Sequence, residues 1–149
     1  MKKIPMLLGV VAVVSIFAIP AHAQELTWGV RAGVFGDNAD PIVGAEAIIP
    51  LTDRIFFNPN VEALFSDSDG NQVIANADAH YDFSAPPDRF IWAGAGLAGL
   101  IGGKNKDFGF GLNVLAGYGW DRKTWEPYIQ GKFVLADNNK FELAAGVRF

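Results

Sequence analysis

The sequence predicts an all-β protein, an eight-stranded antiparallel up-and-down transmembrane β-barrel preceded by a cleaved signal peptide. Three observations predict this fold. About ten residues of alternating polarity recur along the chain and are separated by clusters of turn residues. An apolar leader ends in a small-residue cleavage pattern. Aromatic residues gather near the ends of the alternating segments, as they do at the two surfaces of a bilayer.

The first 23 residues have the pattern of a secretory signal peptide. Lys2 and Lys3 form a charged start, and residues 4–20 are apolar except for Ser15. Residues 21–23 (Ala-His-Ala) then place small residues at both key positions of a cleavage site. An uncleaved membrane anchor is the alternative, because the apolar run is just long enough to span a bilayer. We expect cleavage after residue 23, which leaves a barrel domain of residues 24–149.

The composition excludes several functional classes. Removing Lys2 and Lys3 leaves 10 basic residues against 16 acidic ones, a net charge of −6. An acidic chain without a basic cluster is a poor partner for nucleic acid, because phosphate contacts require clustered Lys and Arg. The chain has no cysteine, which excludes disulfides, thiolate metal sites and a cysteine nucleophile.

Eight segments after residue 24 share the alternating pattern. Their length suits tilted strands that cross a bilayer, and the frequent Gly and Pro residues argue against helices. The segments are 26–35, 42–51, 55–65, 72–83, 90–101, 108–119, 125–135 and 141–149. The connections between them are short, and an even number of strands places both ends of the barrel chain on the same side of the membrane.

Seven of these segments have one face free of charge and one face with charged, amide or glycine residues. The fifth is apolar on both faces, and we place Gly94 and Gly96 inward by analogy with the glycine-rich sixth. A soluble barrel would hide the apolar face, whereas a membrane barrel turns it toward lipid. The membrane arrangement predicts thirteen inward polar residues: Arg31, Glu46, Asn60, Glu62, Asn76, Asp78, His80, Asn113, Tyr128, Gln130, Lys132, Glu142 and Arg148.

Aromatic residues favour the membrane arrangement over the soluble one. With strands that run up and down, they fall into two groups that would form girdles at the two interfaces. One group is Trp28, Phe57, Tyr81, Phe83, Trp92, Tyr118, Trp125 and Phe149, and the other is Phe35, Phe65, Phe108 and Phe133. The last strand also ends on an aromatic residue, whereas soluble domains usually end in a frayed polar tail.

The inward residues could form either a salt-bridge network or a functional path. Barrel closure places the first strand beside both the second and the eighth, so Arg31 should reach Glu46 on one side and Glu142 on the other. Lys132 and Arg148 are placed to neutralise further carboxylates. A narrow gated ion path or a ligand site is the functional alternative. We favour a structural network, because buried charges must be paired whatever the function.

We expect no catalytic residue, metal site or cofactor. His80 is the single histidine after the leader, and the serines there, Ser66, Ser68 and Ser84, all fall in turns. A Ser–His–acid arrangement on a strand is therefore not available. Residues 67–71 resemble the start of a calcium loop but lack its distal ligands, so we interpret them as a hairpin turn.

The last segment resembles the terminal strand of Gram-negative outer-membrane β-barrels. In those proteins a C-terminal Phe with alternating apolar residues is read by the outer-membrane assembly machinery; here the matching residues are Phe141, Leu143, Ala145, Val147 and Phe149. The whole barrel chain is similar to the outer-membrane protein β-barrel domain family, which includes the membrane domain of outer-membrane protein A. Residues 57–62, 93–97 and 127–130 share that likeness. The resemblance implies outer-membrane lipid and the assembly machinery as partners.

The resemblance is specific for architecture and not for activity, because the superfamily includes adhesins, lipid A-modifying enzymes and inert barrels. The loops here are short, which argues against an adhesin. We therefore expect a monomeric, non-enzymatic outer-membrane barrel that contributes to envelope integrity. A narrow channel or a small-ligand-binding barrel is the alternative, and a lipid A-modifying enzyme built around His80 is a third hypothesis.

Overall fold

The protein is a closed barrel of eight strands in the computed structural model, which describes residues 26–83, 87–105 and 107–149. The expected signal peptide and Ser84 lie outside the described residues. All eight predicted strands are present, with bounds within two residues of those expected. They are β1 (Thr27–Phe35), β2 (Asp40–Pro50), β3 (Ile55–Leu64), β4 (Gln72–Phe83), β5 (Arg89–Gly102), β6 (Asp107–Trp120), β7 (Glu126–Leu135) and β8 (Lys140–Arg148).

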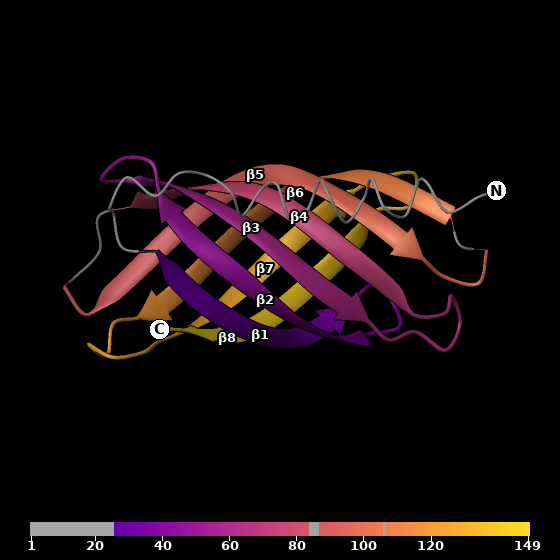
Figure 1. Ribbon diagram of the computed structural model, residues 1–149, viewed down its shortest axis with the longest axis horizontal. Coiled ribbons are helices and arrows are strands. Elements are labelled where there is room, and N and C mark those ends of the chain that lie inside the picture. Colours follow the sequence, from indigo (N-terminus) through magenta and orange to yellow (C-terminus); the bar gives the residue numbers. More distant parts are fainter. Residues whose placement is uncertain (1–25, 84–86, 106) are drawn as a thin grey trace.

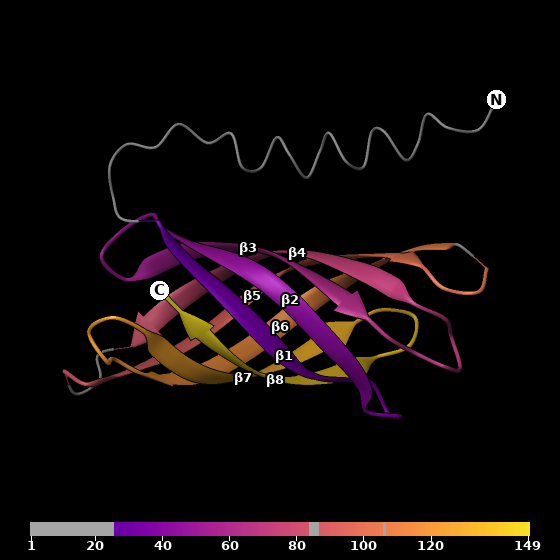
Figure 2. The same ribbon diagram turned by 60° about the horizontal axis from the view of Figure 1, so that its bottom comes forward.

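Each strand pairs antiparallel with the next, and β1 closes the barrel against β8 (Figure 1). The closing register runs from Gly29 opposite Arg148 to Phe35 opposite Glu142. The strands are strongly inclined to the long axis of the barrel (Figure 2), as closure of a sheet requires. The predicted all-β, up-and-down antiparallel topology is therefore confirmed.

The barrel has two distinct ends. The C-terminus and the connections β2–β3, β4–β5 and β6–β7 lie at one end, which we call the inner end; the other four connections lie at the outer end (Figure 1). Two outer connections bond to each other, because Lys104 N donates to Asp69 O at 2.7 Å and Gly103 N donates to Asn71 O at 3.0 Å. Residues 67–69 form a turn, and Gly70, which follows it, adopts the left-handed conformation (φ 79°).

The outer wall of the barrel is apolar. On β6, for example, Phe108, Phe110, Leu112 and Val114 are between 50 % and 69 % exposed. The alternate residues on the strands point into the lumen and carry the polar side chains, so the two faces are inverted relative to a soluble barrel. Among the described residues, no helix has the length and apolar character needed to cross a membrane.

Candidate functional site: a polar network in the barrel lumen

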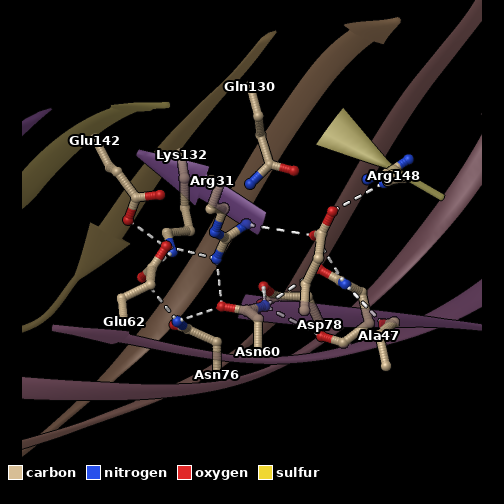
Figure 3. A network of polar contacts seen from close by, with 12 residues as sticks. Arg31, Ala47, Asn60, Glu62, Asn76, Asp78, Gln130, Lys132, Glu142 and Arg148 are labelled. Atoms are coloured by element: carbon tan, nitrogen blue, oxygen red, sulfur yellow. Dashed lines mark hydrogen bonds and ion pairs between the residues drawn. The ribbon is translucent and has the colours of Figure 1, made fainter. Parts of the chain in front are cut away.

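All thirteen residues expected to face inward lie inside the barrel, and each is at most 5 % exposed. They come from all strands except β5, because period-2 alternation gives each strand one inward row. Many of these side chains converge on one polar network in the lumen (Figure 3). They include the residues expected to form a salt-bridge network: Arg31, Glu46, Glu62, Asp78, His80, Gln130, Lys132, Glu142 and Arg148.

Glu62 on β3 is the centre of the first group of contacts. Its carboxylate lies 2.5 Å from Arg31 Nη2 and 3.1 Å from Lys132 Nζ. Asn76 Nδ2 donates to the same carboxylate at 3.1 Å. Lys132 also lies 2.7 Å from Glu142 Oε2, so it bridges two carboxylates (Figure 3). The side chains of these ion pairs are fully buried. Removing any one of them would therefore leave a buried charge without its partner, which is strongly destabilising.

Glu46 on β2 is the centre of the second group. Arg148 Nε donates to Glu46 Oε1 at 2.9 Å, and Asn58 Nδ2 donates to Oε2 at 3.0 Å. Arg31 Nη1 lies 3.7 Å from the same carboxylate, so Arg31 joins the two groups. The interior position of Asn58 follows from the alternation of β3, but its part in the network was not predicted from the sequence.

Asp78 on β4 is held by amides instead of cations. Asn113 Nδ2 donates to Asp78 Oδ1 at 2.7 Å, and Asn60 Nδ2 donates to Oδ2 at 3.1 Å. Asn76 links this group to the first one, because its Nδ2 donates to Asn60 Oδ1 at 2.7 Å as well as to Glu62. Arg31 also donates to Asn60. The amides thus connect all the charged groups of the mid-lumen into one network.

Four glycines make these contacts possible by leaving space between side chains of non-adjacent strands. We call Gly29, Gly44, Gly96 and Gly117 the bridging glycines. Gly44 on β2 pairs with Arg31 on one side and with Glu62 on the other, so the ion pair crosses over it. A Cβ on Gly44 would lie 2.7 Å from Glu62 Cγ and from the Val61 carbonyl oxygen. Any larger residue there would collide with the pair.

The other three bridging glycines occupy equivalent places. Gly29 separates Glu46 from Arg148, and Gly96 separates Asp78 from Asn113. Gly117 lies between Trp92 and Gln130, and Trp92 Nε1 donates to Gln130 Oε1 at 3.2 Å across it. In each case a polar contact joins strands that are second neighbours in the barrel.

The inner end of the lumen is filled by aromatic residues around Arg148. The guanidinium carbon lies 4.4 Å from the Tyr128 ring centroid and 4.7 Å from that of Trp92, within the range of cation–π attraction. His80 stacks on Trp92 with centroids 6.1 Å apart. The expectation that Trp92 belongs to an interfacial girdle is wrong: it is 1 % exposed and shares the inward face of Gly94 and Gly96. Both faces of β5 are apolar, so the polarity of its residues did not show which face points into the lumen.

The outer end of the lumen is filled by an apolar cluster. The cluster consists of Phe35, Ile42, Leu64, Ile74, Ala98 and Val134, each at most 4 % exposed, with Leu100 packed against them. The assignment of Phe35 to the outer aromatic girdle is therefore also wrong, because Phe35 is on the same inward face of β1 as Arg31.

The predicted contact between Arg31 and Glu142 is replaced by another. Glu142 pairs with Phe35 in the β1–β8 register, four residues along the strand from Arg31, and its partner is Lys132. Arg31 instead lies opposite Gly146 on β8 and extends across Gly44 to Glu62. The sequence predicts correctly that β1 and β8 are neighbours, but it does not show which of their residues lie opposite each other.

Two cavities flank the filled part of the lumen, and no residue lines both. The outer cavity, of about 210 Å³, is lined by loop carboxylates and amides together with Phe35, Leu64 and Leu100. The inner cavity, of about 280 Å³, is lined by residues that include His80 and Arg148. The apolar cluster and the polar network lie between the two.

The residues expected to signal assembly lie on the outer face of β8 and at the chain end. Phe141, Leu143 and Phe149 are 43 %, 50 % and 65 % exposed, and Ala145 is also exposed, whereas Val147 is half-buried. Phe149 continues the β8 ladder, because its N donates to Trp28 O at 2.8 Å and its carbonyl accepts from Trp28 N at 3.1 Å.

Comparison with solved structures shows the fold. The N-terminal β-barrel domain of Pseudomonas aeruginosa OprF matches with a TM-score of 0.72 at 15 % identity over 83 % of this chain and 95 % of that one. Neisserial surface protein A matches with a TM-score of 0.56 at 18 % identity, covering 83 % and 94 %. The outer-membrane enzyme PagL matches with a TM-score of 0.57 at 11 % identity, covering 83 % and 98 %.

No family model and no curated protein matches the sequence. The likeness therefore rests on the backbone and its closure, and it carries no activity from one protein to another. Together with the apolar wall and polar lumen, it gives a definite architecture. The chain has the fold of the small eight-stranded outer-membrane β-barrels.

Proposed function

We propose that the protein is a structural outer-membrane barrel that works as a monomer, has a closed lumen and contributes to envelope integrity. The observation that carries this proposal is the filled cross-section of the lumen. The apolar cluster occupies its outer part, the ion-pair network its middle, and Trp92, Tyr128 and Arg148 its inner part. Side chains so packed give the barrel rigidity and leave no room for a transported solute.

The apolar outer wall supports the outer membrane as the location. Large exposed apolar side chains lie on all eight strands, an amount that soluble monomers do not tolerate. Membrane fractionation combined with heat-modifiable gel migration tests this location. The unboiled protein in the outer-membrane fraction should migrate differently from the boiled form. Recovery as a soluble periplasmic protein would overturn the proposal.

Electrical recording separates a closed barrel from a narrow channel. The purified protein in planar bilayers should give no conductance above that of the bare membrane, because the apolar cluster offers ions no polar contacts on their way through the outer end. As a sensitised variant, the double substitution Phe35→Ala and Leu64→Ala removes two of the side chains that fill this end. Steady conductance steps from the wild type would establish the channel alternative instead.

The positions of the candidate catalytic groups support a non-enzymatic role. His80 lies inside the barrel and pairs with Phe56 at the inner end of β4, whereas Ser66 and Ser68 lie in the outer β3–β4 connection. A nucleophile and its base must be within hydrogen-bond reach, which these residues are not. Deletion of the gene should leave the lipid A profile unchanged in mass spectrometry, and a changed profile would revive the enzyme hypothesis.

The exposed face of β8 supports recognition by the outer-membrane assembly machinery. Phe141, Leu143 and Phe149 present apolar side chains on the outward face of the strand that closes the barrel.

The envelope role itself is tested by challenging a deletion strain with detergent and large antibiotics. Increased sensitivity, restored by the wild-type gene, is the expected result; unchanged sensitivity would remove this role.

A further inference from the structure

Several buried polar atoms of the lumen lack a hydrogen-bond partner among the described residues, but only those of Arg148 and His80 line a cavity, the inner one. Arg148 uses Nε for Glu46, but its Nη2 has no partner among the described residues. Nε2 of His80 also has none. These side chains are 5 % and 3 % exposed, and both line the cavity of about 280 Å³. Buried polar groups are nearly always paired, so this wall points to a bound partner.

The chemistry of the two groups indicates an anionic partner on this wall. A guanidinium with free nitrogens binds a carboxylate through charge-assisted hydrogen bonds. The orientation of Arg148 is fixed from both sides, by its bond to Glu46 and by the rings of Tyr128 and Trp92. A fixed donor binds with little loss of side-chain entropy.

Negatively charged side chains also lie on the wall of the inner cavity. Asp82, Asp121 and Glu126 line it, and none of the three forms an ion pair within the described part of the chain. Three carboxylates against Arg89 and Arg148 would repel a simple anion. A ligand that also carries a cationic group would instead neutralise them. Ile48, Phe56 and Phe90 supply apolar lining for the body of such a ligand.

We propose that the inner cavity binds a small zwitterion of amino-acid size, whose carboxylate contacts Arg148 and His80 and whose ammonium group contacts Asp82 and Glu126. The volume of about 280 Å³ lies just below the range of about 300–1,000 Å³ for drug-sized ligand sites, which limits the ligand to this size. This binding goes beyond the structural role and does not depend on whether the lumen is closed.

The test compares L-leucine with its two halves on the full-length folded protein in detergent micelles. The probes are L-leucine, 4-methylpentanoate (which lacks the ammonium group) and 3-methylbutylamine (which lacks the carboxylate). Isothermal titration calorimetry should give a Kd of about 1 mM for leucine and values at least about tenfold weaker for both analogues. NMR signals of the Arg148 and His80 side chains should shift with leucine.

Variants separate the two halves of the site. Asp82→Asn and Glu126→Gln should each weaken leucine binding about tenfold and should leave 4-methylpentanoate binding equal or stronger, because a lost negative charge does not disfavour a carboxylate. Asp53→Asn, an exposed carboxylate on the β2–β3 connection outside the cavity, is the matched control and should bind leucine normally.

Four results would overturn the proposal. They are an analogue that binds as tightly as leucine, Asp82 and Glu126 variants that bind leucine normally, an equal loss in Asp53→Asn, or no heat and no shift up to about 50 mM leucine.

Discussion

Arg31 Nη2 lies 2.5 Å from Glu62 Oε1 although the strands that carry them, β1 and β3, are not adjacent. The contact crosses β2 at Gly44, where no side chain intervenes. Glu62 therefore receives two cations and an amide at a fully buried position, and the integrity of the lumen depends on it.

Replacing Glu62 with Gln should destabilise the barrel by about 3–5 kcal/mol, because Arg31 and Lys132 would each lose a carboxylate from a buried pair. Urea unfolding in phospholipid vesicles, followed by loss of the fast-migrating folded band, measures the change. The control Asp88→Asn breaks an exposed pair with Arg89 at 3.8 Å and should cost at most about 1 kcal/mol. Equal midpoints for the Glu62 variant and the wild type would contradict the assigned role of the network.

Replacing Gly44 with Ala should cost about 1–3 kcal/mol, because the new methyl group would overlap Glu62 and the Val61 carbonyl oxygen. Gly131→Ala is the matched control. A Cβ there would meet only the Phe141 ring, at an ordinary distance of 3.6 Å, and the change should stay within about 0.5 kcal/mol. Similar losses in both variants would show that strand glycines matter only through backbone entropy.

Replacing Val114 with Arg tests which solvent surrounds the barrel. Val114 lies in the middle of β6 and is 50 % exposed, so a charge there would face the centre of the bilayer and cost about 2–4 kcal/mol. Phe108→Arg, near the outer end of the same strand, should cost only about 0–1 kcal/mol. Vesicle unfolding experiments that find both variants equally stable would contradict the membrane position.

Replacing Phe149 with Ser should reduce the folded fraction in cells while leaving refolding into vesicles almost unchanged. The backbone bonds between Phe149 and Trp28 do not need the ring, whereas the proposed recognition of the terminal strand would. Phe108→Ser, a similarly exposed Phe on β6 (69 % against 65 %), should assemble normally. If both variants failed alike in cells, a general loss of apolar surface would explain the defect.

The strands and the two faces of the wall were readable from the sequence because period-2 alternation is a local property. The polarity of residues such as Glu46 and Lys132 was enough to place them inward. What could not be read was the register, which the turns and the whole closed sheet determine together. Arg31 was therefore given a neighbour on the adjacent strand β8, whereas its strongest partner is on a strand two positions away.

The inward position of the apolar residues in the lumen was not predicted from the sequence, for a different reason. Trp92 lies on β5, where both faces are apolar and polarity does not mark the inward one. Phe35 continues the inward row of Arg31 on β1, but an aromatic residue at a strand end also fits an interfacial girdle. A lumen filled by side chains needs only complementary packing, so its outer end can be apolar while its middle is charged. Asn58 shares the inward row of Asn60 and Glu62 on β3, so alternation predicts its position, but its bond to Glu46 depends on the register between β2 and β3.

The bridging glycines have a consequence for how the strands find their places. A slip of two residues between β1 and β2 would keep apolar side chains outside and polar ones inside, so the alternation of the two faces would not oppose it. Such a slip would put Ile42 or Glu46 opposite Arg31 in place of Gly44, and the path to Glu62 would be blocked. The contact across each bridging glycine forms only when three strands are in the correct register. The packing of the lumen therefore destabilises registers that the pairing of two neighbouring strands alone would allow.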